Sequence, residues 1–287
     1  MKGRVVADDG SPVSSAHIRS SHNDGDSTGT KTDAEGYFTI VLPRNEPKNL
    51  YINAGNKYGA LVPLLTDFED SVTLTIQLDS VNQPRFQFEN PGSRIARFAR
   101  LHLDLFQNYI SFVQSLQKLQ KDRQDTKSFF TAWNDSVTNL KQMVLAEKDS
   151  VIRGELLLRY YRLTTIPGLK FDSVFYQKFI TSISVNSPLW FFNNYEAYDQ
   201  SHQRPDGKAF VDSIIANHPS RELRAFLLFE TAREAQFGDN EQRVRQNYAK
   251  LKQDFPDISW SKLADKVIFA DRKLKQRTEI PDFIFKD

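Results

Sequence analysis

The sequence predicts an α+β protein of several domains, with an all-β sandwich over residues 1–79 and an all-α region over residues 93–278. In the first part, short apolar runs alternate with turn residues, as is typical of antiparallel strands. After Leu78 the apolar residues recur every three or four positions, which is the period of a helix. Residues 80–92 hold two prolines and a glycine and predict a linker between the two parts.

Five runs in the first part predict strands, and clusters of Gly, Asp, Asn, Ser and Pro separate them. Gly10 and Gly36 can adopt the positive φ that closes a tight turn. The last run alternates most clearly, so that its apolar side chains share one face. The predicted strands are Arg4–Ala7, Ala16–Arg19, Tyr37–Leu42, Leu50–Ala54 and Val72–Leu78.

Helical spacing continues through the second part. Its cleanest stripe steps by three and four residues from Phe130 to Val144, after a cap at Asp125 or Thr126. A less regular stripe, from Ile95 to Leu116, predicts the helix before it. The later predicted helices are Val151–Leu163, Phe171–Ile183, Pro188–Tyr198, Lys208–Asn217, Glu222–Phe237, Glu241–Asp254 and Ser259 to about Gln276.

The last three predicted helices have short connections, which make neighbouring helices antiparallel. Tyr248-x-x-Leu251 followed by Phe255-Pro256 resembles tetratricopeptide-type helix hairpins. No period of about 34 residues extends over the rest of the helical region, so the resemblance is partial.

Four motifs follow one another in the first part of the chain. They are Gly3-x-Val5, Asp9-Gly10-x-Pro12-Val13, Ala16-x-Ile18 and Thr32-Asp33-x-x-Gly36-x-Phe38. In this order they resemble the carboxypeptidase regulatory-like domain, a transthyretin-like sandwich of seven strands that is common in bacterial cell-envelope proteins. The resemblance runs from about Gly3 to Leu78 and implies a fold without implying peptidase activity. We interpret the last motif as a hairpin turn followed by an inward aromatic side chain.

The end of the chain carries a second resemblance. Pro281-Asp282-Phe283 is similar to the opening of thioredoxin-like domains of envelope thiol-disulfide oxidoreductases and peroxiredoxins. A sandwich, a helical region and this motif, in that order, resemble multidomain thioredoxin-like proteins of Bacteroidetes. The resemblance leads us to expect that residues 279–287 begin a thioredoxin-like domain. The chain stops before any C-x-x-C, so no catalytic residue can be transferred to it.

Composition restricts the partners and the chemistry. The 38 Lys and Arg residues nearly balance 36 Asp and Glu, and a formal charge of +2 gives no footprint for nucleic acid or anionic lipid. No apolar run reaches the about 18 residues of a membrane span. The absence of Cys excludes disulfides, thiolate zinc sites and cysteine nucleophiles. The envelope resemblance implies the periplasm or cell envelope, with a native export signal removed before Met1.

No motif for phosphate, dinucleotide or zinc binding is present, and we expect no catalytic residue, cofactor or metal ion. The oxygen-rich run Asn23–Ser27 could hold calcium, but a solvated hairpin loop is favoured because the spaced acidic series of a calcium loop is missing. Arg94, Arg97 and Arg100 lie on one side of a helix. That spacing favours a solvated face over a site for phosphate or carboxylate.

Trp190, Phe191, Tyr195 and Tyr198 form the candidate surface for a ligand or partner, because this segment has more aromatic residues than one core stripe requires. The alternative is an aromatic core between domains.

Three functions remain open. The preferred one is a non-catalytic accessory region that positions, dimerises or regulates a thioredoxin-like domain after Asp287, or engages another envelope protein. The second is a self-sufficient binding module for a glycan, a peptide or a partner protein. The third is an enzyme that uses carboxylates such as Asp199 and Asp206.

Overall fold

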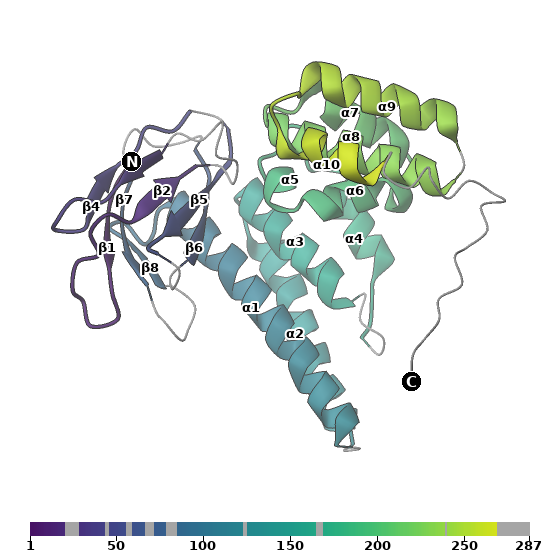
Figure 1. Ribbon diagram of the computed structural model, residues 1–287. Coiled ribbons are helices and arrows are strands. Elements are labelled where there is room, and N and C mark those ends of the chain that lie inside the picture. Colours follow the sequence, from purple (N-terminus) through teal and green to yellow (C-terminus); the bar gives the residue numbers. More distant parts are fainter. Residues whose placement is uncertain are drawn as a thin grey trace, which may run out of the picture. The chain divides into compact units, whose positions relative to one another are not determined.

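The chain forms an α+β protein with two four-stranded sheets and a series of helices (Figure 1). It divides into two compact units, Met1–Ser220 and Arg221–Asp287. The first unit contains both sheets and the helices up to Asn217. The structure, a computed structural model, describes residues 1–20, 29–43, 46–55, 59–66, 72–78, 85–122, 125–164, 169–238 and 240–268.

The two sheets have the strand orders β4-β1-β7-β8 and β3-β2-β5-β6. Strand β1 lies between an antiparallel neighbour, β4, and a parallel one, β7. The other pairs within these two sheets are antiparallel. The strands are β1 (Lys2–Val6), β2 (His17–Arg19), β3 (Gly29–Lys31), β4 (Tyr37–Thr39), β5 (Lys48–Asn53), β6 (Gly59–Leu64), β7 (Thr73–Gln77) and β8 (Arg85–Phe88).

One hydrophobic core lies between the two sheets. Leu74 and Ile76 of β7 and Ile18 and Leu50 of the second sheet are at most 1% exposed. The threonines that alternate with them on β7 point away from the core, as the period of a strand requires. The start of the first long helix adds three apolar side chains to this core, so the helix is anchored to the sheets.

The turn before β4 confirms part of the interpretation of the Thr-Asp-x-x-Gly-x-Phe motif. Asp33 Oδ1 accepts hydrogen bonds from the N–H of Glu35 at 3.1 Å and of Tyr37 at 2.7 Å. Gly36 has φ +79°, and a Cβ there would lie 2.5 Å from the carbonyl oxygen of Val5. Phe38 is buried in the core. These residues therefore build a tight turn and an inward aromatic, but the turn leads from β3 of one sheet to β4 of the other, so it does not join a hairpin.

Three strands lie outside the predicted ones, namely β3, β6 and β8. The prediction of a linker over 80–92 is wrong at Arg85–Phe88, because these residues pair with β7 and extend the first sheet. The prediction of a linker depended on the two prolines near this run, although the side chains of Arg85–Phe88 alternate between polar and apolar.

The helices of the first unit follow the predicted order, with one division. The prediction of a continuous helix over Pro188–Tyr198 is wrong, because the backbone leaves helical geometry at Asn193 (φ −124°, ψ 52°). The helices are α1 (Arg94–Lys121), α2 (Lys127–Ala146), α3 (Ser150–Thr164), α4 (Ser173–Ile180), α5 (Leu189–Phe192), α6 (Asn194–Gln203) and α7 (Gly207–Asn217).

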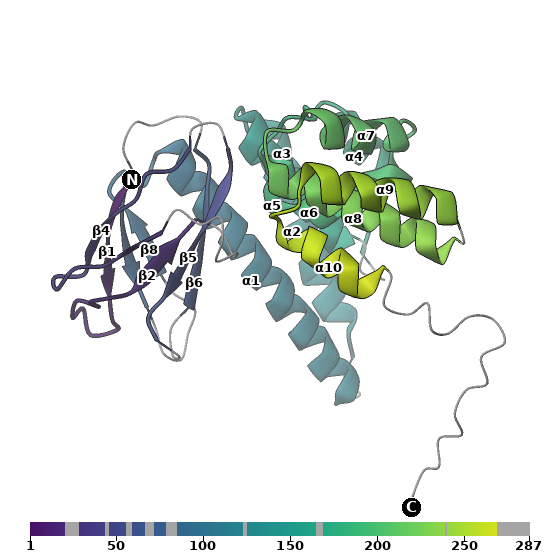
Figure 2. The ribbon, with the colours of Figure 1, turned by 45° about the horizontal axis from the view of Figure 1, so that its top comes forward.

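Aromatic packing joins α1 to α2, and Figure 2 shows the two helices next to each other. Phe112 of α1 is fully buried, with its ring 4.3 Å from the ring of Trp133 and 5.1 Å from that of Phe129. Val137, Leu140 and Val144 of the predicted stripe are buried as expected.

The second unit contains α8 (Arg221–Phe237), α9 (Glu241–Asp254) and α10 (Ser259–Val267). Two of these match the prediction within a residue, and the end predicted near Gln276 lies outside the described residues. Trp260 of α10 packs edge-on against Phe226 of α8, with ring centres 5.0 Å apart. Likeness to tetratricopeptide hairpins remains a prediction.

Two predicted features lie outside the described residues: the calcium candidate Asn23–Ser27 and the thioredoxin-like segment 279–287. Among the helices that the structure describes, none combines the length and apolar character needed to cross a bilayer.

Candidate functional site

Trp190 does not contribute to a surface, so this part of the predicted aromatic site is wrong. Its side chain is 0% exposed, and its Nε1–H donates a hydrogen bond to the carbonyl oxygen of Ser184 at 2.9 Å. Its ring meets Phe210 of α7 edge-on, with centres 5.3 Å apart. Helix α5 is a single turn that turns Trp190 into the core, and the indole N–H is satisfied there.

The other three predicted aromatics differ in exposure. Phe191 and Tyr198 are half-buried, whereas Tyr195 is 59% exposed. The ring of Phe191 packs edge-on against Phe192. With Trp190 in the core, the four residues do not form one aromatic face.

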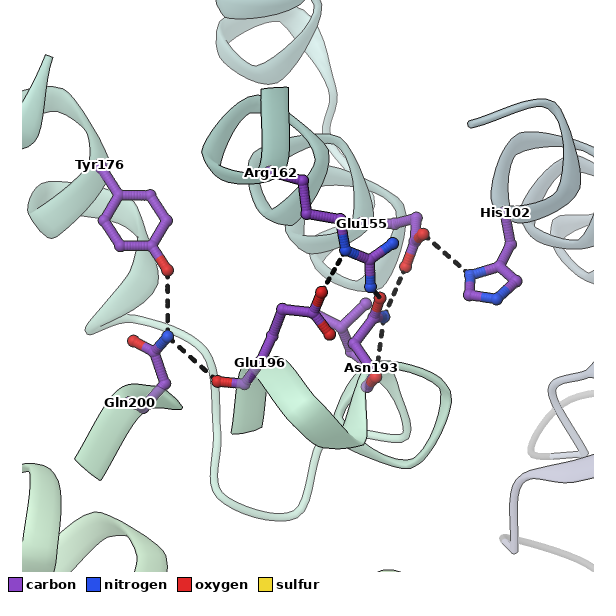
Figure 3. Close-up of polar contacts among 8 residues, drawn as sticks. His102, Glu155, Arg162, Tyr176, Asn193, Glu196 and Gln200 are labelled. Atoms are coloured by element: carbon purple, nitrogen blue, oxygen red, sulfur yellow. Dashed lines mark hydrogen bonds and ion pairs between the residues drawn. The ribbon is translucent and has the colours of Figure 1, made fainter. Parts of the chain in front are cut away.

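A polar network centred on two buried residues, Glu155 and Asn193, lies within the first unit. It consists of His102 from α1, Glu155 and Arg162 from α3, Asn193 between α5 and α6, and Glu196 from α6 (Figure 3). The network links three helices that are far apart in sequence.

Glu155 is the centre of the network and is 1% exposed. Its Oε1 lies 2.9 Å from His102 Nδ1, and its Oε2 accepts a hydrogen bond from Asn193 Nδ2 at 2.7 Å. Burial raises the pKa of Glu155, but His102, Arg162 and Asn193 outweigh it and leave the pKa below its ordinary value. Glu155 is therefore a buried carboxylate that its neighbours keep ionised.

The imidazole of His102 is packed as well as bonded. It stacks against Phe98 and lies at a tilt to Phe192, with each ring centre 5.8 Å away. Its side chain is 15% exposed. The ring orientation is thus fixed by two aromatic side chains and one carboxylate.

Arg162 extends the network toward α6. Its Nη2 donates to Asn193 Oδ1 at 2.6 Å, and its Nε donates to the carboxylate of Glu196. Asn193 therefore accepts from a cation and donates to an anion, which explains why an amide at the helix break can be buried.

Gln200 continues the polar chain on α6 (Figure 3). Its Nε2 donates to the hydroxyl of Tyr176 at 3.1 Å and to the carbonyl oxygen of Glu196 at 3.2 Å. Burial raises the pKa of Tyr176, so its phenol stays neutral. These contacts tie α4 to α6.

The two carboxylates considered for catalysis have different surroundings. Asp199 is half-buried, and burial together with Glu196 raises its pKa. Asp206 is exposed, and its two oxygens accept hydrogen bonds from Arg204 Nε at 2.9 Å and Nη2 at 3.1 Å. The bonds from Arg204 lower the pKa of Asp206. Asp206 is therefore engaged by a cation rather than available as an acid or base.

The three arginines on α1 also differ in their partners. Arg94 pairs with Asp149, and Arg97 Nη2 lies 2.6 Å from Glu147 Oε2. Asp149 in turn caps α3 by accepting from the N–H groups of Val151 and Ile152. Two of the three therefore secure the turn between α2 and α3.

The third, Arg100, is exposed and lines a groove of about 1300 Å³ between α1 and β8. This volume is larger than the about 300–1,000 Å³ of typical small-molecule pockets. Arg85, Phe86 and Glu89 form one wall, and Ala99 and Leu103 belong to the other. Sequence reasoning missed the groove because β8 fell in the predicted linker. The signal that could have found it is the alternation of charged or polar and aromatic residues at 85–89.

Among the described residues, no group of three or more His, Asp or Glu side chains is arranged to hold a metal ion. No protein-family model matches the chain, and comparison with curated proteins finds no significant match.

Proposed function

We propose that this region is a non-catalytic accessory part of a cell-envelope protein, which positions, dimerises or regulates a thioredoxin-like domain after Asp287. The order of the sequence motifs supports this assignment, from the sandwich motifs through the helices to Pro281-Asp282-Phe283. Two sheets around one core are compatible with a transthyretin-like sandwich, although the described residues form eight strands where the resemblance implies seven. The same resemblance supports a place in the periplasm or cell envelope.

The observation that carries the proposal is the groove between β8 and α1. Its walls combine an edge strand, apolar side chains and exposed residues of both charges. Such a surface suits recognition of a polypeptide, since an edge strand offers main-chain hydrogen bonds. The polar network, by contrast, joins helices to each other.

The experiment is to determine the mass of the native product in its source cells and to read the coding frame beyond Asp287. An antibody raised against this chain identifies the product. A mass well above 33.1 kDa, with C-x-x-C encoded downstream, is the expected result. A native product that ends at Asp287 would contradict the accessory role.

The second candidate is a self-sufficient binding module, which the size of the groove favours. It predicts a saturable glycan, peptide or protein ligand for the chain alone. Replacing Leu103 with Trp would fill part of the groove and weaken the binding of that ligand. Blank glycan arrays, peptide libraries and pull-downs would exclude this candidate.

A further inference from the structure

The two edges of the first sheet differ in how their main-chain groups are satisfied. At β4, Tyr37 N–H donates to Asp33 Oδ1 at 2.7 Å, and the carbonyl oxygen of Tyr37 accepts from Asp33 N–H at 2.9 Å. The turn thus satisfies the outward main-chain groups of Tyr37 on β4. Strand β8 forms the opposite edge and faces the groove.

The hydrogen-bond parity of β8 decides which of its groups point outward. Glu89 N–H donates to the carbonyl oxygen of Thr73 at 3.0 Å, and Phe88 lies opposite Leu74 in the register. In an antiparallel pair, bonded and non-bonded positions alternate. The main-chain groups of Phe86 and Phe88 therefore point away from β7. Within the described part of the chain, they have no main-chain partner on that side.

The side chains of this edge form a self-complementary pattern. Arg85, Gln87 and Glu89 are exposed and share one face, with opposite charges at the two ends. Suppose a second β8 lies antiparallel so that Phe86 faces the partner's Phe88. Gln87 then faces the partner's Gln87, and each Arg85 faces a Glu89. These charged pairs occupy non-hydrogen-bonded positions, where the Cα atoms approach to about 4.5 Å and side chains interact most closely.

The same register also gives the β8 edge partners for its main-chain groups and for its aromatic side chains. Phe86 and the partner's Phe88 exchange main-chain hydrogen bonds, and their rings form a cross-strand pair on the core side. Phe86 is half-buried in the single copy, so the pair would cover more of it.

We propose that two copies of this chain associate through β8, in an antiparallel pair centred on Gln87 that joins their first sheets. This inference deepens the accessory role proposed above, on which it rests, by naming its dimerising surface. A second copy is favoured over an unrelated peptide because the charge order is complementary to itself under two-fold symmetry. A shift of the register by two residues, the smallest that keeps the hydrogen-bond pattern, would place Gln87 opposite Arg85 or Glu89 of the other copy.

Sedimentation equilibrium over a concentration series tests the pairing. The wild-type chain should show a reversible monomer–dimer equilibrium. The single variants Arg85→Glu and Glu89→Arg should each weaken self-association by at least about tenfold, because two-fold symmetry turns two attractive pairs into two repulsive ones. An equimolar mixture of the two variants should associate again, as should the double variant R85E/E89R.

The matched control exchanges a charge pair elsewhere on the surface. Glu241 and Arg245 form an exposed ion pair on α9, and the double variant E241R/R245E should leave the association constant unchanged. Circular dichroism confirms that each variant is folded. A wild-type chain that stays monomeric would overturn the inference, as would a dimer insensitive to the β8 exchanges or a monomer that binds only an extended peptide. The native mass tests the accessory role separately, so the two failures are distinguishable.

Discussion

At the edge strand β8 and directly after it, the charged side chains Arg85 and Glu89 are exposed, whereas Glu155 of α3 is buried among its partners. Both regions belong to the first unit. Removing one member of a buried ionic network leaves an uncompensated charge, which costs about 3–5 kcal/mol. Exposed charges contribute far less to folding. We therefore expect charge substitutions to reduce stability in the helical part and to reduce association at β8.

The largest expected effect is at Glu155. Glu155→Ala should lower the free energy of unfolding by about 3–5 kcal/mol, because His102, Asn193 and Arg162 lose their common carboxylate. Urea unfolding followed by circular dichroism measures the loss. Asp135→Ala on α2 is the exposed control, because Asp135 lies outside the proposed β8 pairing, and it should change stability by less than about 0.5 kcal/mol. Equal losses for the two variants would contradict the distinction between buried and exposed charges.

The sheets should be most sensitive to backbone geometry. Gly36→Ala should cost about 2–3 kcal/mol, because it adds a clash with the carbonyl oxygen of Val5 to the strain of positive φ. Gly10 is the matched control, because it has φ +81° and a Cβ added there would meet nothing within 4 Å. Gly10→Ala should therefore cost only about 1 kcal/mol. Similar melting temperatures for the two variants would argue against the clash.

A smaller effect is expected at the turn beside β4, the other edge of the first sheet. Asp33→Ala removes the acceptor of two main-chain N–H groups and should cost about 1–2 kcal/mol. The amide of Tyr37 should then exchange faster with solvent. Asp33→Asn keeps an acceptor oxygen and should retain much of the stability. The interpretation fails if Tyr37 exchanges at the same rate in all three proteins.

The smallest effect concerns acid stability. Burial raises the pKa of Asp149, but the N–H of Ile152 and the Arg94 guanidinium outweigh it, so the folded pKa lies below the unfolded one. The contribution is fully present above the unfolded value of about 3.9 and is lost as pH falls through the folded pKa. Asp149→Asn should therefore flatten the stability profile in that acidic range. An unchanged acidic slope in urea titrations would exclude this role.

The sequence predicted the features that local patterns encode. The alternation in β7 and the Asp33–Gly36 turn depend on neighbouring residues, and α8 and α9 begin and end near the predicted positions. The break at Asn193 was not predictable, because its amide is held by Glu155, 38 positions away. Nor was the burial of Glu155, since its hydrogen-bond partners His102 and Asn193 are distant in the sequence. Charges at helical spacing usually indicate a solvated face.

The most direct test of the interaction role is amide hydrogen exchange at single residues, measured at low and high protein concentration. The two edges of the first sheet then serve as each other's control. The Phe86 and Phe88 amides should become protected as concentration rises, while the Tyr37 amide, already bonded to Asp33, should not change. If the amides of Phe86 and Phe88 each exchange at the same rate at low and at high concentration, the pairing through β8 is wrong.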